Sequence, residues 1–122
     1  MTALRDFFER DPHGCAAVYL FGSRARDDFH ERSDVDVAVL WETKPEDPVE
    51  LRIAADLSRL FGREVDVVVL NTASPDVRHR VLRHECLILD HNRSARIRFE
   101  VATRNEYFDI LPMLRRYRKM AS

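Results

Sequence analysis

The chain has 122 residues, a formal net charge of −1, 45% hydrophobic and 34% charged residues, three glycines and five prolines. This size fits one folded domain with a modest core, and the composition excludes a low-complexity or linker-rich protein. No apolar run is long enough to span a membrane, and the acidic N-terminus MTALRDFFERD does not resemble a signal peptide. We therefore expect a cytoplasmic protein without membrane contact.

The first half of the chain begins with elements of clear hydrophobic pattern. A short helix is expected over residues 3–11, and the continuous apolar run CAAVYLF predicts a buried strand over residues 15–21. Gly22 ends this strand, and Ser23 can cap a short helix that extends to about Asp28. Cys15 and Cys86 occur without a CxxC pair and are expected to be reduced, buried residues.

Residues 34–41 (DVDVAVLW) alternate between valines and polar residues, which predicts a strand. The next helix is expected to have Asp47 as its N-cap and Pro48 at its first helical position, and to end at Gly62. Its apolar stripe is expected to consist of Val49, Ile53, Leu57 and Leu60.

The second half continues the alternation of strands and helices. A strand is expected over residues 64–70 (EVDVVVL), a helix from Ser74-Pro75 to about His84, and a short strand over residues 86–90. The remaining residues look helical, and Pro112 should kink or divide this last helix. The predicted fold class is α/β (α+β), a small mixed sheet with flanking helices.

The charge is unevenly divided along the chain. Residues 93–122 contain eight basic and three acidic residues, a net charge of +5, whereas residues 1–92 contain twelve basic and eighteen acidic residues, a net charge of −6. We therefore divide the domain into a core (1–92) and a basic helical C-terminal extension (93–122). The extension fits equally well a docking surface for an acidic partner or a solvated helix. Its charge would give only weak, salt-sensitive binding to nucleic acid, so direct nucleic-acid binding is not expected.

Three aspartates stand among the core valines of the predicted strands. Asp34 and Asp36 project from the same face of one strand, and Asp66 has the matching parity on another. If those strands are neighbours, the three carboxylates converge, and a divalent cation is the common relief of their repulsion. Carboxylate oxygens favour Mg²⁺ or Mn²⁺ over zinc. Two such ions would activate an incoming hydroxyl and neutralise a leaving diphosphate.

A second group of residues suits a nucleotide. Gly22 and Ser23 follow a strand and open a helix, so that backbone N–H groups and a hydroxyl could hold phosphates. Arg24 and Arg26 follow at once and could place a guanidinium on a triphosphate. The P-loop pattern GxxxxGK[ST] does not occur in the sequence. The proposed phosphate site at Gly22 and Ser23 and the three carboxylates together predict an enzyme that transfers a nucleotidyl group.

The order of these motifs resembles that of a known group of enzymes. Gly22-Ser23, then ten residues, Asp34-Val35-Asp36 and later Asp66 are similar to the signature of the DNA polymerase beta-like nucleotidyltransferase superfamily. Nearly the whole chain, including the ending Leu114-Arg115-Arg116-Tyr117, resembles the minimal nucleotidyltransferases, or MNT antitoxins. The resemblance implies the polymerase beta-like fold and a HEPN-family ribonuclease toxin as partner.

The resemblance also implies a reaction. The chain would be the antitoxin of a type VII-like HEPN/MNT pair and would transfer AMP from ATP to a tyrosine hydroxyl of the toxin. Asp34, Asp36 and Asp66 would hold two Mg²⁺ ions, with Asp66 helping to deprotonate the acceptor, and Gly22 and Ser23 would hold the nucleotide phosphates. The family usually has glycine where this chain has Asp27, so an extra carboxylate stands near the expected phosphate site.

Two other functions fit the same residues. A catalytically idle module with this fold could neutralise a partner by binding alone, although such a role would not need three carboxylates on one face. A small-molecule nucleotidyltransferase would need a substrate domain, for which residues 93–122 are too few unless an oligomer builds a shared cleft. The sequence leaves homo-oligomers and hetero-oligomers equally open. Trp41 is expected to pack rather than stack on a base, and Tyr107 and Tyr117 fit packing or partner contact.

Overall fold

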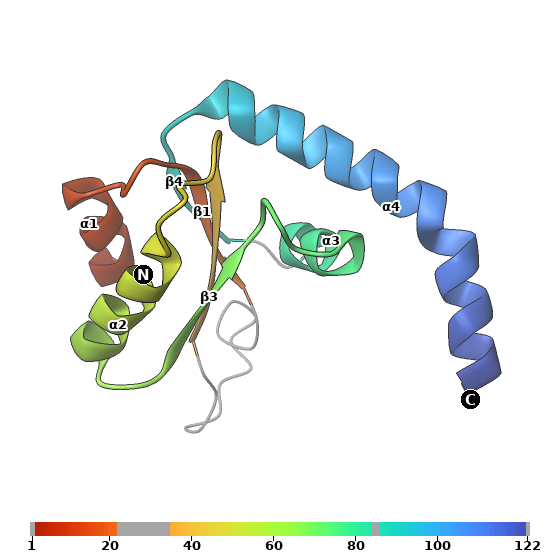
Figure 1. Cartoon of the computed structure of the whole chain (residues 1–122), viewed down its shortest axis with the longest axis horizontal. Helices are drawn as coiled ribbons and strands as arrows, with labels where there is room; N and C mark the ends of the chain where they lie inside the picture. Colours follow the sequence, from red (N-terminus) through yellow and green to blue (C-terminus); the bar gives the residue numbers. More distant parts are fainter. Residues whose placement is uncertain (1, 22–34, 84–85, 122) are drawn as a thin grey trace.

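The computed structural model describes residues 2–21, 35–83 and 86–121. Within these ranges the chain forms one four-stranded sheet and four helices (Figure 1). The strands are β1 (Cys15–Phe21), β2 (Val35–Trp41), β3 (Val65–Val69) and β4 (Cys86–Asp90), and the helices are α1 (Thr2–Arg10), α2 (Val49–Phe61), α3 (Pro75–Arg83) and α4 (Arg93–Ala121). The predicted mixed α/β fold is confirmed. The short helix predicted between Ser23 and Asp28 lies outside the described residues.

The sheet is mixed, with the strand order β3-β2-β1-β4. β1 pairs antiparallel with both β2 and β4, whereas β2 and β3 are parallel neighbours. A parallel pair cannot be joined by a hairpin, and here α2 makes the crossover between the two strands.

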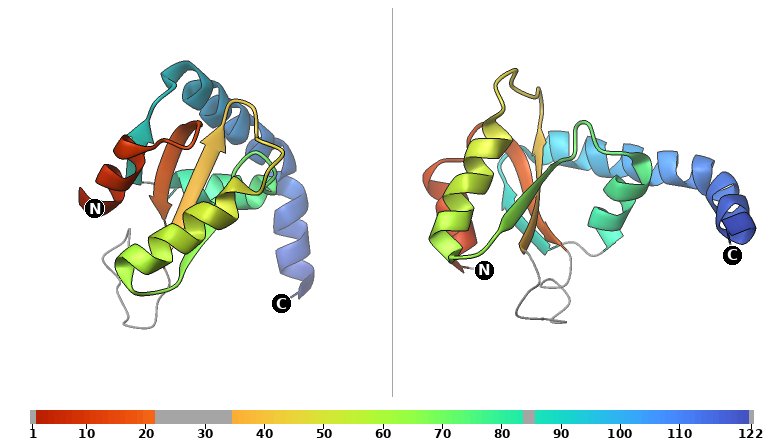
Figure 2. Two further views of the ribbon diagram at one scale, coloured as in Figure 1. Left: turned by 60° about the vertical axis from the view of Figure 1, so that its left-hand side comes forward. Right: turned by 60° about the horizontal axis from the view of Figure 1, so that its bottom comes forward.

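Strand alternation sends side chains into two separate core clusters, one on each face of the sheet. On one face, where α1 and α2 pack, the cluster includes Val35, Val37 and Val39 of β2. On the other face, Ala38 and Leu40 of the same strand pack with side chains of α3. Figures 1 and 2 show this arrangement, with α1 and α2 on one side of the sheet and α3 and α4 on the other.

The limits of α2 differ from the prediction at its N-terminus only. Pro48 is the N-cap position and makes no side-chain cap, so the prediction of Asp47 as N-cap and Pro48 as first helical residue is wrong by one residue. Gly62 ends the helix as predicted, in the left-handed conformation (φ 66°), with its N–H donating to the carbonyl oxygen of Ser58. Leu60 is 54% exposed and lies outside the core clusters, so the apolar stripe is shorter than expected.

Both cysteines are free, and Cys15 is fully buried while Cys86 is half-buried. Burial raises the pKa of the Cys15 thiol to about 12, with the charge of Asp11 adding to the effect. Trp41 is buried, and its indole N–H donates to the carbonyl oxygen of His13 at 2.9 Å. Trp41 is therefore a core residue, as expected, and not a base-stacking platform.

Helix α4 runs through Pro112 as one element of 29 residues. Pro112 therefore does not divide the helix, although its missing N–H and its ring weaken the turn before it. Figure 1 shows the C-terminal part of α4 turned away from the direction of its first part. None of the helices in the described part of the chain combines the length and the apolar character that crossing a membrane requires.

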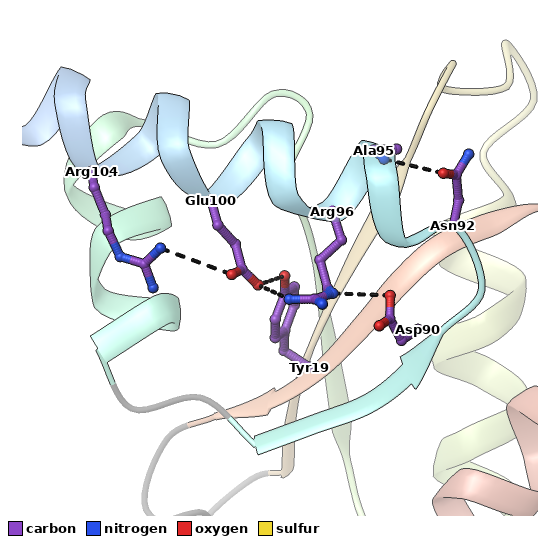
Figure 3. A network of polar contacts seen from close by, with 7 residues as sticks. All are labelled: Tyr19, Asp90, Asn92, Ala95, Arg96, Glu100 and Arg104. Atoms are coloured by element: carbon purple, nitrogen blue, oxygen red, sulfur yellow. Dashed lines mark hydrogen bonds and ion pairs between the residues drawn. The ribbon is translucent and has the colours of Figure 1, made fainter.

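A buried polar network joins the first half of α4 to the sheet (Figure 3). Tyr19 of β1 donates its hydroxyl to Glu100 Oε2 at 2.8 Å, and Arg96 donates to the same oxygen at 3.0 Å. Arg96 also donates to Asp90 Oδ1 at 2.9 Å. These hydrogen bonds, first with Asp90 and then with Glu100, raise the pKa of the Arg96 guanidinium. Glu100 is 8% exposed, and the hydrogen bonds from Tyr19 and Arg96 replace contacts that its side chain would otherwise make with water.

We expect Arg96→Met to lower the free energy of unfolding by about 2 kcal/mol or more, because Glu100 loses its closest cationic partner while staying buried. Urea unfolding of the purified chain measures this change. The matched control is Arg98→Met on the same helix: Arg98 pairs with Glu42 at 3.7 Å, both side chains are more than half exposed, and the cost should stay below about 0.5 kcal/mol. Equal costs for the two variants would contradict the structural role of Arg96.

Candidate active site

Asp36 and Asp66 occupy directly neighbouring positions in the parallel pair. The register of β2 and β3 places Val35 beside Val65, Asp36 beside Asp66 and Val37 beside Val67. Hydrogen-bonded strands lie about 4.8 Å apart, and paired residues point to the same face of the sheet. The condition on which the sequence prediction depended, that the two strands are neighbours, is therefore met for these two carboxylates.

The carboxylates lie on the α3 and α4 side of the sheet. Val35, Val37 and Val65 belong to the core cluster on the α1 and α2 side, so alternation places Asp36 and Asp66 on the opposite face. Phe21, which pairs with Asp36 across the β1–β2 ladder, packs in the cluster of that same face. A row Asp66–Asp36–Phe21 thus crosses three strands near one end of the sheet.

The charges of this pair are only partly screened. Asp66 is exposed and Asp36 is half-buried. Two carboxylates at the spacing of neighbouring strands repel each other by about 1 kcal/mol where water surrounds them and by more where it does not. Both offer hard oxygen donors, which suits Mg²⁺ or Mn²⁺. Within the described ranges no group of three or more His, Cys, Asp or Glu side chains could hold a metal ion.

The other predicted site residues lie outside the described residues. These are the carboxylate Asp34, the phosphate-seat residues Gly22 and Ser23, the arginines Arg24 and Arg26, and the unexpected Asp27. In the sequence, Gly22 directly follows Phe21, the residue paired with Asp36. The predicted roles of these residues stay predictions.

A small polar pocket of about 150 Å³ lies between α3 and α4, on the same side of the sheet as the two carboxylates. Its lining is mainly cationic and consists of Asp76, His79, Arg80, Arg83, Tyr107 and Arg118. The four residues from α3 are spaced at i, i+3, i+4 and i+7, so they lie on one face of the helix. This spacing can be read in the sequence, but it does not predict a pocket, because the opposite wall comes from α4. The imidazole of His79 stacks on the ring of Tyr107, with centroids 3.5 Å apart.

Arg78 has a structural role in the same region. Its guanidinium donates to the carbonyl oxygens of Leu70 and Asn71, each at 2.8 Å, and pairs with Glu106 of α4 at 3.6 Å. Arg78 therefore fixes the loop after β3 to both α3 and α4. A larger cavity of about 460 Å³ lies between α1 and α2, on the face of the sheet opposite the carboxylates.

Comparison with known proteins identifies the family. The model of the family "Polymerase beta, Nucleotidyltransferase" matches residues 3–94, which is most of the chain and includes both Asp36 and Asp66. The chain belongs to the polymerase beta nucleotidyltransferase family. The family expected from the motifs is confirmed.

Three relatives are similar to this nucleotidyltransferase. The "Putative protein adenylyltransferase" of Methanocaldococcus jannaschii is 31% identical over 77 residues, which cover 63% of this chain and 83% of the relative. A chain of a toxin–antitoxin crystal structure determined with AMP-PNP is 21% identical, with a TM-score of 0.83, covering 98% of this chain and 96% of its own. A chain of the structure of a tri-AMPylated Shewanella oneidensis HEPN toxin with its MNT antitoxin is 20% identical, with a TM-score of 0.76, covering 99% and 98%. The two structures share the fold of the nucleotidyltransferase, and the matches cover 98% and 99% of its chain.

His79 makes the stability of the nucleotidyltransferase depend on pH. Burial lowers the pKa of His79 below its ordinary value, the charges of Arg83 and Arg104 lower it further, and Asp76 acts in the opposite direction. The unfolded chain therefore takes up a proton at His79 more readily than the folded chain. The free energy of unfolding therefore includes a contribution from neutral His79. This contribution is complete above a pH of about 6.5 and is lost as the pH falls below that value.

We expect His79→Phe, which keeps an aromatic ring against Tyr107, to show a smaller loss of unfolding free energy than the wild type between about pH 7 and pH 5. Urea unfolding at a series of pH values measures both slopes. His91→Asn is the control, because His91 is exposed, and this variant should keep the wild-type slope. A wild-type slope in His79→Phe would show that His79 does not carry the effect.

Proposed function

We propose that this nucleotidyltransferase is the antitoxin of a HEPN/MNT toxin–antitoxin pair and transfers AMP from ATP to a tyrosine hydroxyl of the HEPN ribonuclease toxin. Its relatives support this: one carries the description "Putative protein adenylyltransferase", and two chains with the same fold come from toxin–antitoxin structures, one of them with an AMPylated toxin. The cytoplasm, where ATP and Mg²⁺ are abundant, is the proposed location.

The observation that carries the proposal is the pairing of Asp36 with Asp66. Two carboxylates on adjacent strands repel each other, a divalent cation would offset this repulsion, and the register of the strands brings both carboxylates to one face of the sheet. We propose Asp34, from the same strand segment of the sequence, as the third carboxylate of this site, and Gly22, Ser23, Arg24 and Arg26 as the residues that bind the nucleotide.

In the proposed reaction the acceptor tyrosine oxygen attacks the α-phosphorus of ATP. A new oxygen–phosphorus bond forms, the bond from the α-phosphorus to the bridging oxygen breaks, and diphosphate leaves with the electron pair. In this proposal Asp66, the more exposed of the pair, would accept the tyrosine proton, with Asp36 beside it on the neighbouring strand. Mg²⁺ bound by these carboxylates would supply charge neutralisation at the phosphates and would activate the hydroxyl.

The division of the chain into a core (1–92) and a basic extension (93–122) is part of the proposal. The family match ends at residue 94, and α4 begins at Arg93, so the catalytic core and the long helix meet at this point. The core would bind the nucleotide, and the acceptor protein would bring most of its own binding surface.

We expect Asp36→Asn and Asp66→Asn each to lower the rate of AMP transfer by more than about 100-fold, because each amide keeps the shape of the carboxylate but removes its charge. The measurement is transfer of label from α-³²P-ATP to the HEPN toxin proposed as the partner. Asp56→Asn is the matched control, since Asp56 is on α2, on the other side of the sheet, and this variant should keep wild-type activity.

Absence of label on the toxin with the wild-type chain would reject the transfer reaction. If Asp36→Asn and Asp66→Asn instead protect cells from the toxin as well as the wild type does, the chain neutralises its partner by binding alone.

We expect EDTA to abolish AMP transfer, and Mg²⁺ or Mn²⁺ in excess to restore it, because both ions prefer carboxylate oxygens. Zn²⁺ should restore little activity, since the described carboxylate pair includes no thiolate or imidazole. Thermal unfolding provides a readout separate from activity: Mg²⁺ should raise the Tm of the wild type but not that of Asp36→Asn. Full transfer in EDTA would exclude a metal-dependent site.

A further inference from the structure

The C-terminal half of α4 exposes large apolar side chains. Of the eight large hydrophobic residues that are exposed in the described part of the chain, six lie on α4. Four of these fall within residues 108–121, which we call the distal helix: Phe108 (66% exposed), Met113 (61%), Tyr117 (69%) and Met120 (85%).

The two halves of α4 differ in their contacts. In the first half Ala95, Glu100 and Thr103 are buried against the sheet and α3. The distal helix continues beyond α3 toward the C-terminus (Figures 1 and 2). Arg118 of the distal helix pairs with Asp76 of α3 at 3.7 Å, and this largely exposed ion pair contributes little to stability. Isolated helices shorter than about 12–15 residues are marginal in water, so a helix of this length gains most from packing against another surface.

The distal helix is also basic. Arg115, Arg116, Arg118 and Lys119 stand against the single acidic residue Asp109. Arg115 and Arg116 are exposed and form no ion pair with any residue in the described ranges. Aromatic side chains, methionine and arginine are the residue types enriched in protein–protein interfaces. A partner that fits would present apolar side chains ringed by carboxylates.

The core reaction does not explain the distal helix. The family match ends at residue 94, and the archaeal relative aligns over 83% of its own length with only 63% of this chain. The chains from toxin–antitoxin structures, in contrast, match 98–99% of it. The part of the molecule that exceeds the catalytic core is thus shared with chains that were crystallised with a protein partner.

We propose that the distal helix is the docking surface for the acceptor protein, and that it binds an apolar, acidic surface of the HEPN toxin. The inference rests on the proposed function for the identity of the partner. It also fits the placement of the site, because α4 covers the same side of the sheet that carries Asp36 and Asp66. A protein bound by α4 is held on the side from which its tyrosine must approach the carboxylates.

The test measures, by calorimetry, the affinity of the proposed HEPN partner for the native chain, for a triple-alanine variant of the distal helix and for a double-alanine control. Met113→Ala/Tyr117→Ala/Met120→Ala should weaken binding by about 30-fold or more, since alanine keeps the helix but removes the exposed apolar anchors. Leu51→Ala/Leu60→Ala on α2 is the control, since both side chains are more than half exposed and lie on the other side of the sheet, and it should bind like the wild type. Arg115→Glu/Arg116→Glu should slow association and reverse its salt dependence.

All affinities are measured on an Asp36→Asn background, so that binding is separated from transfer. Wild-type affinity of the triple variant overturns the docking surface even if AMP transfer proceeds, whereas tight binding without transfer by the native chain rejects only the reaction. Two further outcomes with unchanged toxin affinity would also overturn the proposal. If the triple variant loses a homodimer that the native chain forms, the distal helix binds a second copy of the chain. If the triple variant loses binding to anionic phospholipid vesicles, the distal helix binds a membrane. Unchanged affinity for ATP in the triple variant confirms that the core is intact.

Discussion

The register of β2 against β3 is the constraint on which the site depends. Because side chains alternate along a strand, one register sends Val35, Val37 and Val65 into the core and Asp36 and Asp66 to the opposite face. A register shift of one residue would turn the valines toward the opposite face and bury the carboxylates in the core, which would strongly destabilise the folded state. The hydrophobic pattern that stabilises the sheet therefore also fixes the two acids side by side.

The parallel direction of this pair decides which face of the sheet carries the crossover helix. A parallel pair requires a crossover, and α2 makes it over the valine face, where its own apolar stripe is buried. The carboxylate face is then covered by α3 and α4, whose cluster centres on Ala17, Tyr19 and Leu40 rather than on the acidic end. The network from Tyr19 to Glu100 and Arg96 holds α4 over that part of the sheet.

Strand identity and parity could be predicted from the valine alternation, and so could the possibility that Asp36 and Asp66 meet. The sequence could not supply the strand order, which depends on pairings between distant segments. For the same reason, the sequence does not reveal that Arg96, one of the basic residues of the C-terminal extension, is bound between Asp90 and Glu100. The hydroxyl that completes this network belongs to Tyr19, 81 residues from Glu100. The predicted start of α2 is wrong by one residue, because the pair Asp47-Pro48 does not distinguish a proline at the first helical position from a proline at the N-cap.

A small catalytic core gains from a separate binding element. Transfer needs the acceptor hydroxyl to stay aligned with the α-phosphorus, and a sheet of this size offers little surface to hold a protein in that position. A helix that is anchored at one end by a buried ion-pair network and exposed along its distal half can supply binding energy without altering the carboxylates. The rigid anchoring matters because binding energy contributes to catalysis only when it restricts the position of the reacting atoms. The Arg96–Glu100 network thus joins α4, whose distal helix we propose as the docking surface, to β1, the strand that pairs with β2 at Asp36.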